Sequence, residues 1–260
     1  MADESSEPPP YVHMTSQLME IFPEKGGSFQ IEPDASSGSY FLAAARLVRS
    51  SAGGHDEALP SVAVAHWPTS RWQIDQCFPE IIRRTVALHH GLEAHLNGII
   101  PDRRKKKGTV PSEVSSISRE KDLGDSIMTA IVLAPFALEE VRFIDLGRLR
   151  VQETERVAAL KAELTKCGAK VVETQDTLEV FPSELHGAEI ETYDDHRIAM
   201  CFGILGLKVP GIRIKNPACV KKTFPNFFQK LATPPPQGLG TRIVYVSNGQ
   251  LLSFPELFAE

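Results

Sequence analysis

The sequence has no long hydrophobic run and little that marks a secreted or membrane protein. No apolar stretch reaches the roughly 18 residues that a membrane-spanning helix needs. Residues 1–10 are acidic and rich in proline, and they lack the basic start and apolar centre of a secretion signal. We therefore expect a cytoplasmic protein, with no membrane partner, whose residues 1–10 are disordered.

Cysteines are few and irregularly spaced, which argues against a disulfide framework or a zinc site. The four are Cys77, Cys167, Cys201 and Cys219. Three histidines, His89, His90 and His95, lie on a moderately amphipathic segment, where surface or half-buried positions explain them better than a metal site. The sequence therefore predicts free thiols and no bound metal.

The charge balance does not favour a nucleic-acid-binding protein. The chain carries 28 Lys and Arg against 33 Asp and Glu, which gives a net charge of −5. A basic run at residues 103–107 has no interleaved aromatic residues and is followed by a serine-rich stretch. A solvated loop is the expected structure, and contact with a nucleic acid or another polyanion is the alternative.

The segment 191–200, Glu-Thr-Tyr-Asp-Asp-His-Arg-Ile-Ala-Met, places two acids, a histidine and an arginine directly before an apolar run. Residues 198–207 carry no charge and predict a buried helix with Arg197 in its first turn. Unpaired backbone N–H groups at a helix start attract anions. The segment therefore indicates an anionic ligand, although Asp194 or Asp195 could simply cap the helix.

Two further segments carry charges at spacings that suit a binding site. Glu153 and Arg156 open an amphipathic helix and would share one face of it, as in a surface salt bridge or in a site. In the segment 216–228, two prolines bracket a short loop that carries Lys221 and Lys222. Such a loop positions its lysines more firmly than a free surface would.

The hydrophobic pattern predicts a repeated arrangement of helices and strands. Each of three nearly uncharged helices follows a turn that contains aspartate, and each precedes a strand and a more amphipathic helix. The first helices are expected at residues 40–45, 127–138 and 198–207, the strands at 62–65, 141–144 and 212–214, and the second helices at 74–88, 153–167 and 224–231. Alternation at 170–174 and 177–181 predicts a hairpin. The pattern is that of β/α units around three buried helices.

Five segments in this order resemble the EPSP synthases of the enolpyruvyl transferase family. They are Pro33–Ala45, Gly124–Ala137, the Gln-Glu-Thr-Glu-Arg of residues 152–156, the Tyr-Asp-Asp-His-Arg of residues 193–197 and the Lys-Thr-Phe-Pro of residues 222–225. The resemblance covers roughly residues 11–231 and weakens between residues 48 and 121. It implies an α/β (α+β) fold, one enolpyruvyl transferase lobe of three βαβαββ units around buried helices.

Members of the family have two similar lobes, and the motifs of the first lobe do not occur in this sequence. The resemblance implies that residues 11–28 correspond to the last helix of that lobe, at the hinge, and that residues 29–239 form the second lobe. Residues 240–260 lie beyond the family pattern, and their Asn248-Gly249 predicts a hairpin turn. We expect this C-terminal hairpin to complete the sheet of the lobe.

The chemistry implied by the resemblance transfers enolpyruvyl from phosphoenolpyruvate to the 5-hydroxyl of shikimate 3-phosphate, in aromatic amino acid biosynthesis, without a cofactor. Asp125 would act at the sugar hydroxyl, and Glu153 would give and take the proton at the methylene carbon. Arg156, Arg197 and Lys222 would hold phosphoenolpyruvate. Tyr11 matches a tyrosine that contacts the phosphate of shikimate 3-phosphate.

Two departures from the family pattern fall within the site. Gln152 stands where the family has a lysine before the glutamate, and Arg148 stands where an asparagine is common. By their positions in the motif, the resemblance implies that both bind substrate. The sequence leaves two functions open. The chain could be an EPSP synthase lobe that binds both substrates and needs a separate first lobe for full activity, or a descendant that binds an anion or a partner without catalysis.

Overall fold

The computed structural model describes residues 10–49, 62–86 and 115–260, and the statements below concern these ranges. Three expectations lie outside the described residues. They are the disorder of residues 1–10 except Pro10, the exposure of His89, His90 and His95, and the solvated loop at residues 103–107. Pro10 instead begins a helix.

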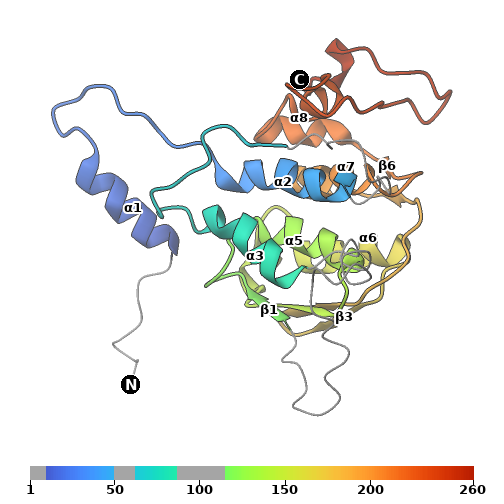
Figure 1. The fold of residues 1–260 in the computed structure, drawn as a ribbon, viewed down its shortest axis with the longest axis horizontal. Helices are drawn as coiled ribbons and strands as arrows, with labels where there is room; N and C mark the ends of the chain where they lie inside the picture. Colours follow the sequence, from blue (N-terminus) through green and yellow to red (C-terminus); the bar gives the residue numbers. More distant parts are fainter. Residues whose placement is uncertain (1–9, 50–61, 87–114) are drawn as a thin grey trace, which may run out of the picture.

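One complete βαβαββ unit forms the centre of the chain (Figure 1). Its elements are β1 (Ser115–Ser118), α5 (Ile127–Leu133), β2 (Val141–Ile144), α6 (Arg156–Lys166), β3 (Val171–Thr174) and β4 (Thr177–Val180). The sheet order is β1-β2-β4-β3, in which β1 and β2 are parallel and β4 is antiparallel to both neighbours. The parallel pair requires the crossover that α5 supplies, and the predicted hairpin of β3 and β4 is confirmed.

The flanking units are shorter than the sequence pattern predicted. The C-terminal unit contains β5 (Glu189–Ile190), α7 (His196–Leu205), β6 (Arg213–Ile214), the 3₁₀ helix η5 (Pro217–Lys222) and α8 (Phe227–Ala232). The N-terminal unit contains α2 (Ala35–Arg49), the 3₁₀ helix η1 (Ile74–Cys77) and α3 (Phe78–Thr85). The strand expected at residues 62–65 does not form within the described residues. The α/β class is therefore confirmed, and one of the three expected units is complete within the described residues.

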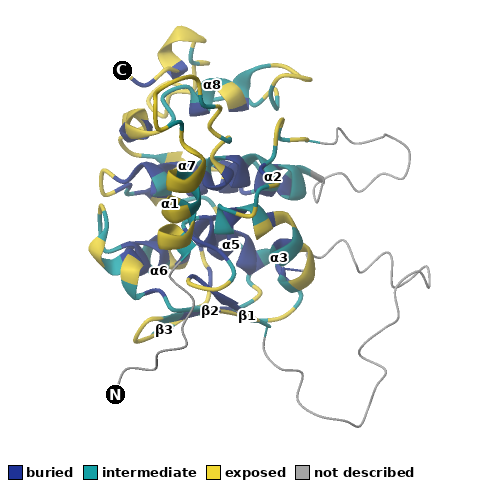
Figure 2. Ribbon diagram, turned by 90° about the vertical axis from the view of Figure 1, so that its left-hand side faces the viewer, coloured by how far each residue is buried: buried dark blue, intermediate teal, exposed yellow. Residues whose placement is uncertain are grey.

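The core lies between the three helices that the sequence predicted to be buried. Every residue of α5 is buried, as are eight of the ten residues of α7. A helix that is apolar all round needs neighbours on all sides, and α2, α5 and α7 pack against one another. Figure 2 shows the buried residues concentrated in these three helices.

An aromatic cluster joins α8 to α2. Phe227 is fully buried and lies edge-on to Tyr40, with ring centroids 5.7 Å apart, and it also contacts the rings of Phe41, Phe224 and Phe228. Edge-to-face pairs of this kind stabilise a core beyond the area that they bury. The cluster fixes α8 to the central helix layer.

Helix α1 (Pro10–Ile21) extends from the body and has no buried residue (Figure 1). Its exposed apolar side chains include Val12, Met19 and Ile21. No helix within the described residues is long and apolar enough to cross a membrane.

The C-terminal segment forms its predicted turn but does not complete a sheet. Val244 and Leu251 make an isolated antiparallel bridge around the turn. Both ends of the segment contact α8. Before the turn, the Thr241 N–H donates to the Leu231 carbonyl, and after it the 3₁₀ helix η6 (Pro255–Leu257) packs against α8. Within the described residues, neither of the two sheets includes any part of residues 240–260. The expectation of sheet completion is therefore not met, because α8 provides the surface that the segment covers.

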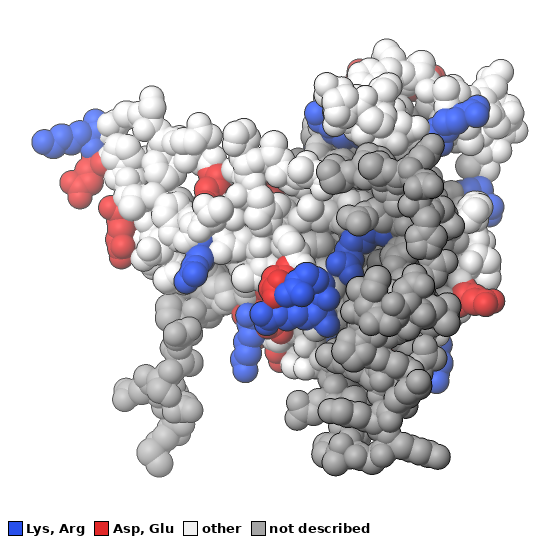
Figure 3. Space-filling model, in the orientation of Figure 1, with Lys and Arg blue, Asp and Glu red and all other residues white. Residues whose placement is uncertain are grey.

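Charges of both signs stand side by side on the face drawn in Figure 3. On α3, Glu80 forms ion pairs with Arg83 and Arg84, all of them exposed. Pairs of this kind contribute little to stability, because water and salt screen the charges. Because positive and negative side chains alternate, the described part of this face does not carry a patch of one charge.

Candidate active site

The start of α7 organises the charged residues of the site. Asp195 is fully buried and caps the helix, because its Oδ1 accepts the N–H of Arg197 at 2.8 Å. The two residues before it, Tyr193 and Asp194, have positive φ angles of 54° and 56°, which few residues other than glycine adopt. The expectation that Arg197 lies in the first turn is confirmed, and so is the alternative that Asp195 is the cap.

Asp125 lies between two arginines. Its Oδ1 is 2.8 Å from Arg119 Nη2, and its Oδ2 is 3.3 Å from Arg197 Nη2. Burial would raise the pKa of Asp125, but the positive charges of Arg197 and Arg119 outweigh it and hold the pKa below its ordinary value. Asp125 is therefore an ionised carboxylate at neutral pH.

Arg197 also binds α2. Its Nη1 donates to the Tyr40 hydroxyl at 3.3 Å and its Nη2 to the Ser36 hydroxyl at 3.2 Å. Ser36 is in turn held by Asp34, whose carboxylate caps α2 by accepting the N–H groups of Ser36 and Ser37. The guanidinium is thus fixed in direction while part of it faces a cavity.

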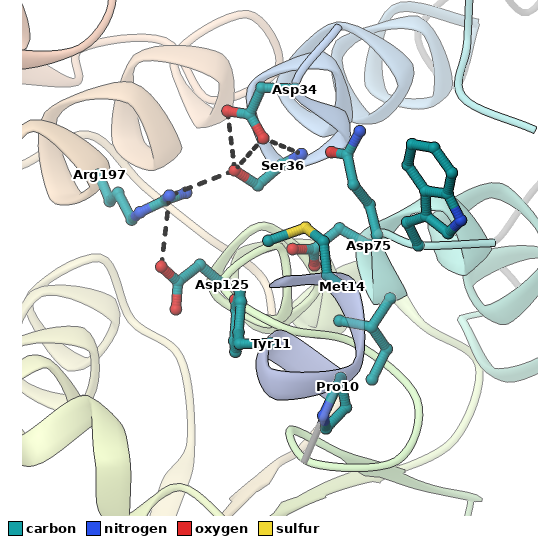
Figure 4. A pocket seen from close by; sticks show the side chains of 11 residues that line it. Pro10, Tyr11, Met14, Asp34, Ser36, Asp75, Asp125 and Arg197 are labelled. Atoms are coloured by element: carbon teal, nitrogen blue, oxygen red, sulfur yellow. Dashed lines mark hydrogen bonds and ion pairs between the residues drawn. The ribbon is translucent and has the colours of Figure 1, made fainter. Parts of the chain in front are cut away.

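The cavity has a volume of about 190 Å³ (Figure 4). Arg197, Asp125, Asp34 and Ser36 line one side of it, and Tyr11 and Met14 project into it from α1. The remaining lining residues are Pro10, Trp72, Gln73, Ile74 and Asp75. Polar and charged groups from α1, α2, η1, α5 and α7 therefore converge on one small space.

Arg156 forms a second charged centre beside the first. Its side chain is fully buried, and its Nε donates to Asp195 Oδ2 at 2.7 Å. Its Nη1 donates to Gln152 Oε1 at 2.6 Å, and its Nη2 lies 2.6 Å from Glu153 Oε2. Asp195 therefore links the two centres, because it binds both Arg156 and the backbone of Arg197.

The expectation that Glu153 and Arg156 share one helical face is wrong. Helix α6 begins at Arg156 because Glu155 caps it, accepting the N–H of Ala158. Glu153 lies in the preceding loop and reaches Arg156 from there. The ion pair forms all the same, so the sequence spacing predicted the contact but not its geometry.

Glu153 is bound by two cations. Besides Arg156, it accepts a hydrogen bond of 2.5 Å from Lys222 Nζ at the end of η5. Partial burial would raise the pKa of Glu153, but the hydrogen bond from Lys222 and the charges of Lys222 and Arg156 lower it to about 2. The Glu153–Lys222 pair joins the loop before α6 to the end of η5, 69 residues away in sequence.

Three other predicted site residues take different positions. Tyr11 lines the cavity, and burial followed by the charges of Asp125 and Asp75 raises its pKa to about 12. Gln152 serves as an acceptor for Arg156, a contact that a lysine could not make. Arg148 lies exposed in the 3₁₀ helix η4 (Gly147–Val151) and joins neither charged centre within the described residues.

Sequence reasoning missed Arg119, Asp75 and Ser36 as members of the site. Asp34 was noted only as part of a turn. A cap signal was available for Asp34 and Ser36, since Asp-Ala-Ser-Ser precedes a predicted helix. Arg119 and Asp75 carry no local signal, because Arg119 reaches Asp125 through the turn of the β1–α5 connection and Asp75 reaches Ser126 through the packing of a distant segment.

Comparison with known proteins matches this arrangement to one family. Residues 12–231 match the pattern of EPSP synthase (3-phosphoshikimate 1-carboxyvinyltransferase). The chain belongs to the EPSP synthase family. The family resemblance of the five sequence segments is thereby confirmed.

Several EPSP synthases show how much of the family this chain covers. It is 34% identical over 244 residues to the 3-phosphoshikimate 1-carboxyvinyltransferase of Hamiltonella defensa, across 86% of this chain and 52% of that protein. It is 37% identical over 243 residues to the chloroplastic enzyme of Solanum lycopersicum, across 85% and 44%. The EPSP synthase structure from Acinetobacter baumannii has a similar fold, with a TM-score of 0.52 at 22% identity over 78% of this chain and 47% of that one. The chain spans about half the length of these relatives.

The donor set of the site suits organic anions better than metals. Within the ranges that the structure describes, no group of three or more His, Cys, Asp or Glu side chains could hold a metal ion. The four cysteines are free thiols, as predicted. Guanidinium and ammonium groups are instead the natural partners of carboxylates and phosphates.

We expect Lys222→Met to raise the pKa of Glu153 from about 2 toward its ordinary value of 4.5. The low folded-state pKa stabilises the fold above pH 4.5, and this contribution is lost as the pH falls toward 2. The variant should therefore lose less stability on acidification than the parent. Carboxyl ¹³C NMR titration gives the pKa, and Lys221→Met is the matched control. Equal Glu153 titrations in both variants would contradict the pairing.

Proposed function

We propose that this chain supplies one half of an EPSP synthase active site, which binds phosphoenolpyruvate and shikimate 3-phosphate. The observation that supports this most directly is that four separate segments bring Asp125 to Arg197 and Glu153 to Lys222, in two charged centres that Asp195 links. Packing alone does not require so many charges in one place. The relatives named for this activity are about twice as long, so the reaction is proposed with a complementing half.

The proposed roles follow from the positions and the charges. Asp125 is ionised and lines the cavity, where it can accept the proton or a hydrogen bond of a sugar hydroxyl. Arg197 is held by α2 with its guanidinium toward the cavity, and it would bind a carboxylate or phosphate. Lys222 is half exposed and can turn from Glu153 to an incoming anion.

Proton transfer at the methylene carbon is assigned to Glu153. In the unliganded chain this group is ionised, with a pKa near 2, and so it cannot donate a proton. When the anionic groups of the ligand draw Lys222 to themselves and bring negative charge near Glu153, the stabilisation of the carboxylate weakens and its pKa rises. Binding of the ligand would therefore raise the pKa of Glu153 and allow this group to donate a proton.

The deciding experiment is a phosphate-release assay with shikimate 3-phosphate and phosphoenolpyruvate. The chain is tested alone and mixed with the first half of an EPSP synthase relative expressed as a separate chain. We expect release only from the mixture, because each half holds part of the binding charge. A mixture that neither releases phosphate nor binds either substrate by calorimetry would contradict the proposal.

A non-catalytic anion-binding role is the second candidate. The observation in its favour is that Gln152, which stands where the family has a lysine, adds no positive charge and instead accepts a hydrogen bond from Arg156. Calorimetric binding of phosphoenolpyruvate without any phosphate release from the mixture would favour this role.

The cytoplasmic location stays a prediction, since relatives named for the same activity include a chloroplastic one.

A further inference from the structure

Asp75 is a buried carboxyl in the cavity to which the proposed reaction assigns no role. It comes from η1, is only 5% exposed, and lines the cavity opposite Arg197 (Figure 4). Its Oδ1 accepts the backbone N–H of Ser126 at 3.0 Å and also a short hydrogen bond from the Ser126 hydroxyl. Ser126 directly follows Asp125 and is the N-cap residue of α5.

This contact replaces a cap that α5 does not make for itself. The Ser126 side chain forms no capping bond within its own helix, and it turns to Asp75 instead. Because Ser126 is fully buried, its N–H and hydroxyl would lose their partner without Asp75. An unsatisfied buried donor costs about 1–3 kcal/mol. The backbone that carries Asp125 is therefore tied to a segment 51 residues away in sequence.

Gly124 leaves space for the contact between Asp75 and Ser126, because it has no side chain. A Cβ atom at Gly124 would lie 2.5 Å from the Tyr11 hydroxyl and 2.7 Å from Asp75 Oδ2. Both distances are shorter than packed atoms allow, so a side chain at position 124 would displace Tyr11 and Asp75 from their places beside Asp125. Three segments distant in sequence thus converge on the peptide before α5.

The two carboxyl groups differ in their surroundings. Asp125 has ion pairs with Arg119 and Arg197, whereas Asp75 has no ion pair within the described residues. The groups that face Asp75 are Ser126 from α5, the Asp125 carboxylate, the Tyr11 hydroxyl and, at longer range, Arg197. Burial raises the pKa of Asp75, the Ser126 hydrogen bonds oppose this, and the nearby Asp125 charge adds to it.

We propose that Asp75 is a positioning residue of this site, which holds Asp125 between Arg119 and Arg197 by fixing Ser126 at the start of α5. The inference rests on the proposed function, because the position of Asp125 matters to turnover only if Asp125 takes part in the proposed reaction. A carboxylate displaced by about 1 Å from its productive position can lose about 10²-fold in rate. The contact that sets that position therefore matters to turnover without touching the substrate.

The test compares Asp75→Ala with Asp75→Asn. The asparagine Oδ1 can accept both Ser126 hydrogen bonds, whereas alanine accepts none. In the complemented phosphate-release assay we expect Asp75→Ala to lower kcat about 10²-fold with little change in KM, and Asp75→Asn to restore most of the rate. The control is Asp122→Ala, which removes an acceptor of the Ser118 N–H from the same β1–α5 connection.

A second measurement does not depend on turnover. The pKa of Asp125, followed by carboxyl ¹³C NMR in the chain without substrate, should rise in Asp75→Ala and stay unchanged in Asp75→Asn. Loss of the Asp75 charge alone would lower the pKa of Asp125 or leave it unchanged in both variants. If the parent is inactive while the NMR pattern holds, the proposed function fails and the positioning contact stands. Equal Asp125 titrations in both variants, or equal rate losses, would overturn the inference.

Discussion

Replacing Arg156 with alanine is expected to lower the free energy of unfolding by about 3–5 kcal/mol, because it breaks a buried ion pair and leaves one charge behind. The charge left behind is that of Asp195, whose side chain is fully buried and whose Oδ2 lies 2.7 Å from Arg156 Nε. Asp195 also caps α7, so its displacement would loosen the helix that carries Arg197. Gln152 and Glu153 would lose a partner at the same time.

Urea unfolding followed by circular dichroism measures this loss. The control is Arg142→Ala, which removes the exposed pair with Glu179 on the sheet and should cost less than about 1 kcal/mol. Arg156→Lys should recover only part of the stability, because an ammonium group cannot bind Asp195, Gln152 and Glu153 with the planar fork of a guanidinium. A loss in Arg156→Ala no greater than that in the control would show that Asp195 finds another partner or takes up a proton.

Glu153→Gln is expected to reduce phosphate release from the complemented chain by about 10²–10⁴-fold, the usual contribution of a positioned acid or base. Glutamine keeps the size of the side chain and can still accept from Lys222, but it can neither give nor take the proton. The effect should fall on kcat, since the cations that bind the ligand remain.

The matched control is Glu155→Gln, two residues away. Its amide oxygen can still accept the Ala158 N–H that caps α6, so activity should change little. Phosphate release is followed with both substrates saturating, and unfolding curves check that the two variants are equally folded. Activity that survives in Glu153→Gln would exclude Glu153 as the proton donor.

The sequence predicted those parts of the site that depend on local pattern. The uncharged run after Arg197 predicted the buried helix α7, and the aspartates before it predicted the cap that Asp195 provides. The alternation after residue 170 predicted the β3–β4 hairpin. In each case the signal and the structure lie within a few residues of each other, where propensity and hydrogen bonding decide the conformation.

The parts that escaped prediction depend on the direction of a turn or on packing between distant segments. Arg119 becomes a site residue only because the β1–α5 connection turns it toward Asp125, and Asp75 only because η1 packs against the start of α5. The C-terminal segment was expected at a sheet edge, but α8 offered it a closer surface. No pattern within one segment reports which other segment it will meet.

The aromatic cluster under α8 has a consequence for how heat would disable the protein. Phe227 rests edge-on against Tyr40, and the hydroxyl of the same Tyr40 receives a hydrogen bond from Arg197. Fraying of α8 would therefore free the ring that packs against Tyr40, and this local opening does not require the central sheet to separate. We expect the affinity for the proposed ligand to fall at a lower temperature than the main melting transition. A binding assay and an unfolding curve would then give two different midpoint temperatures.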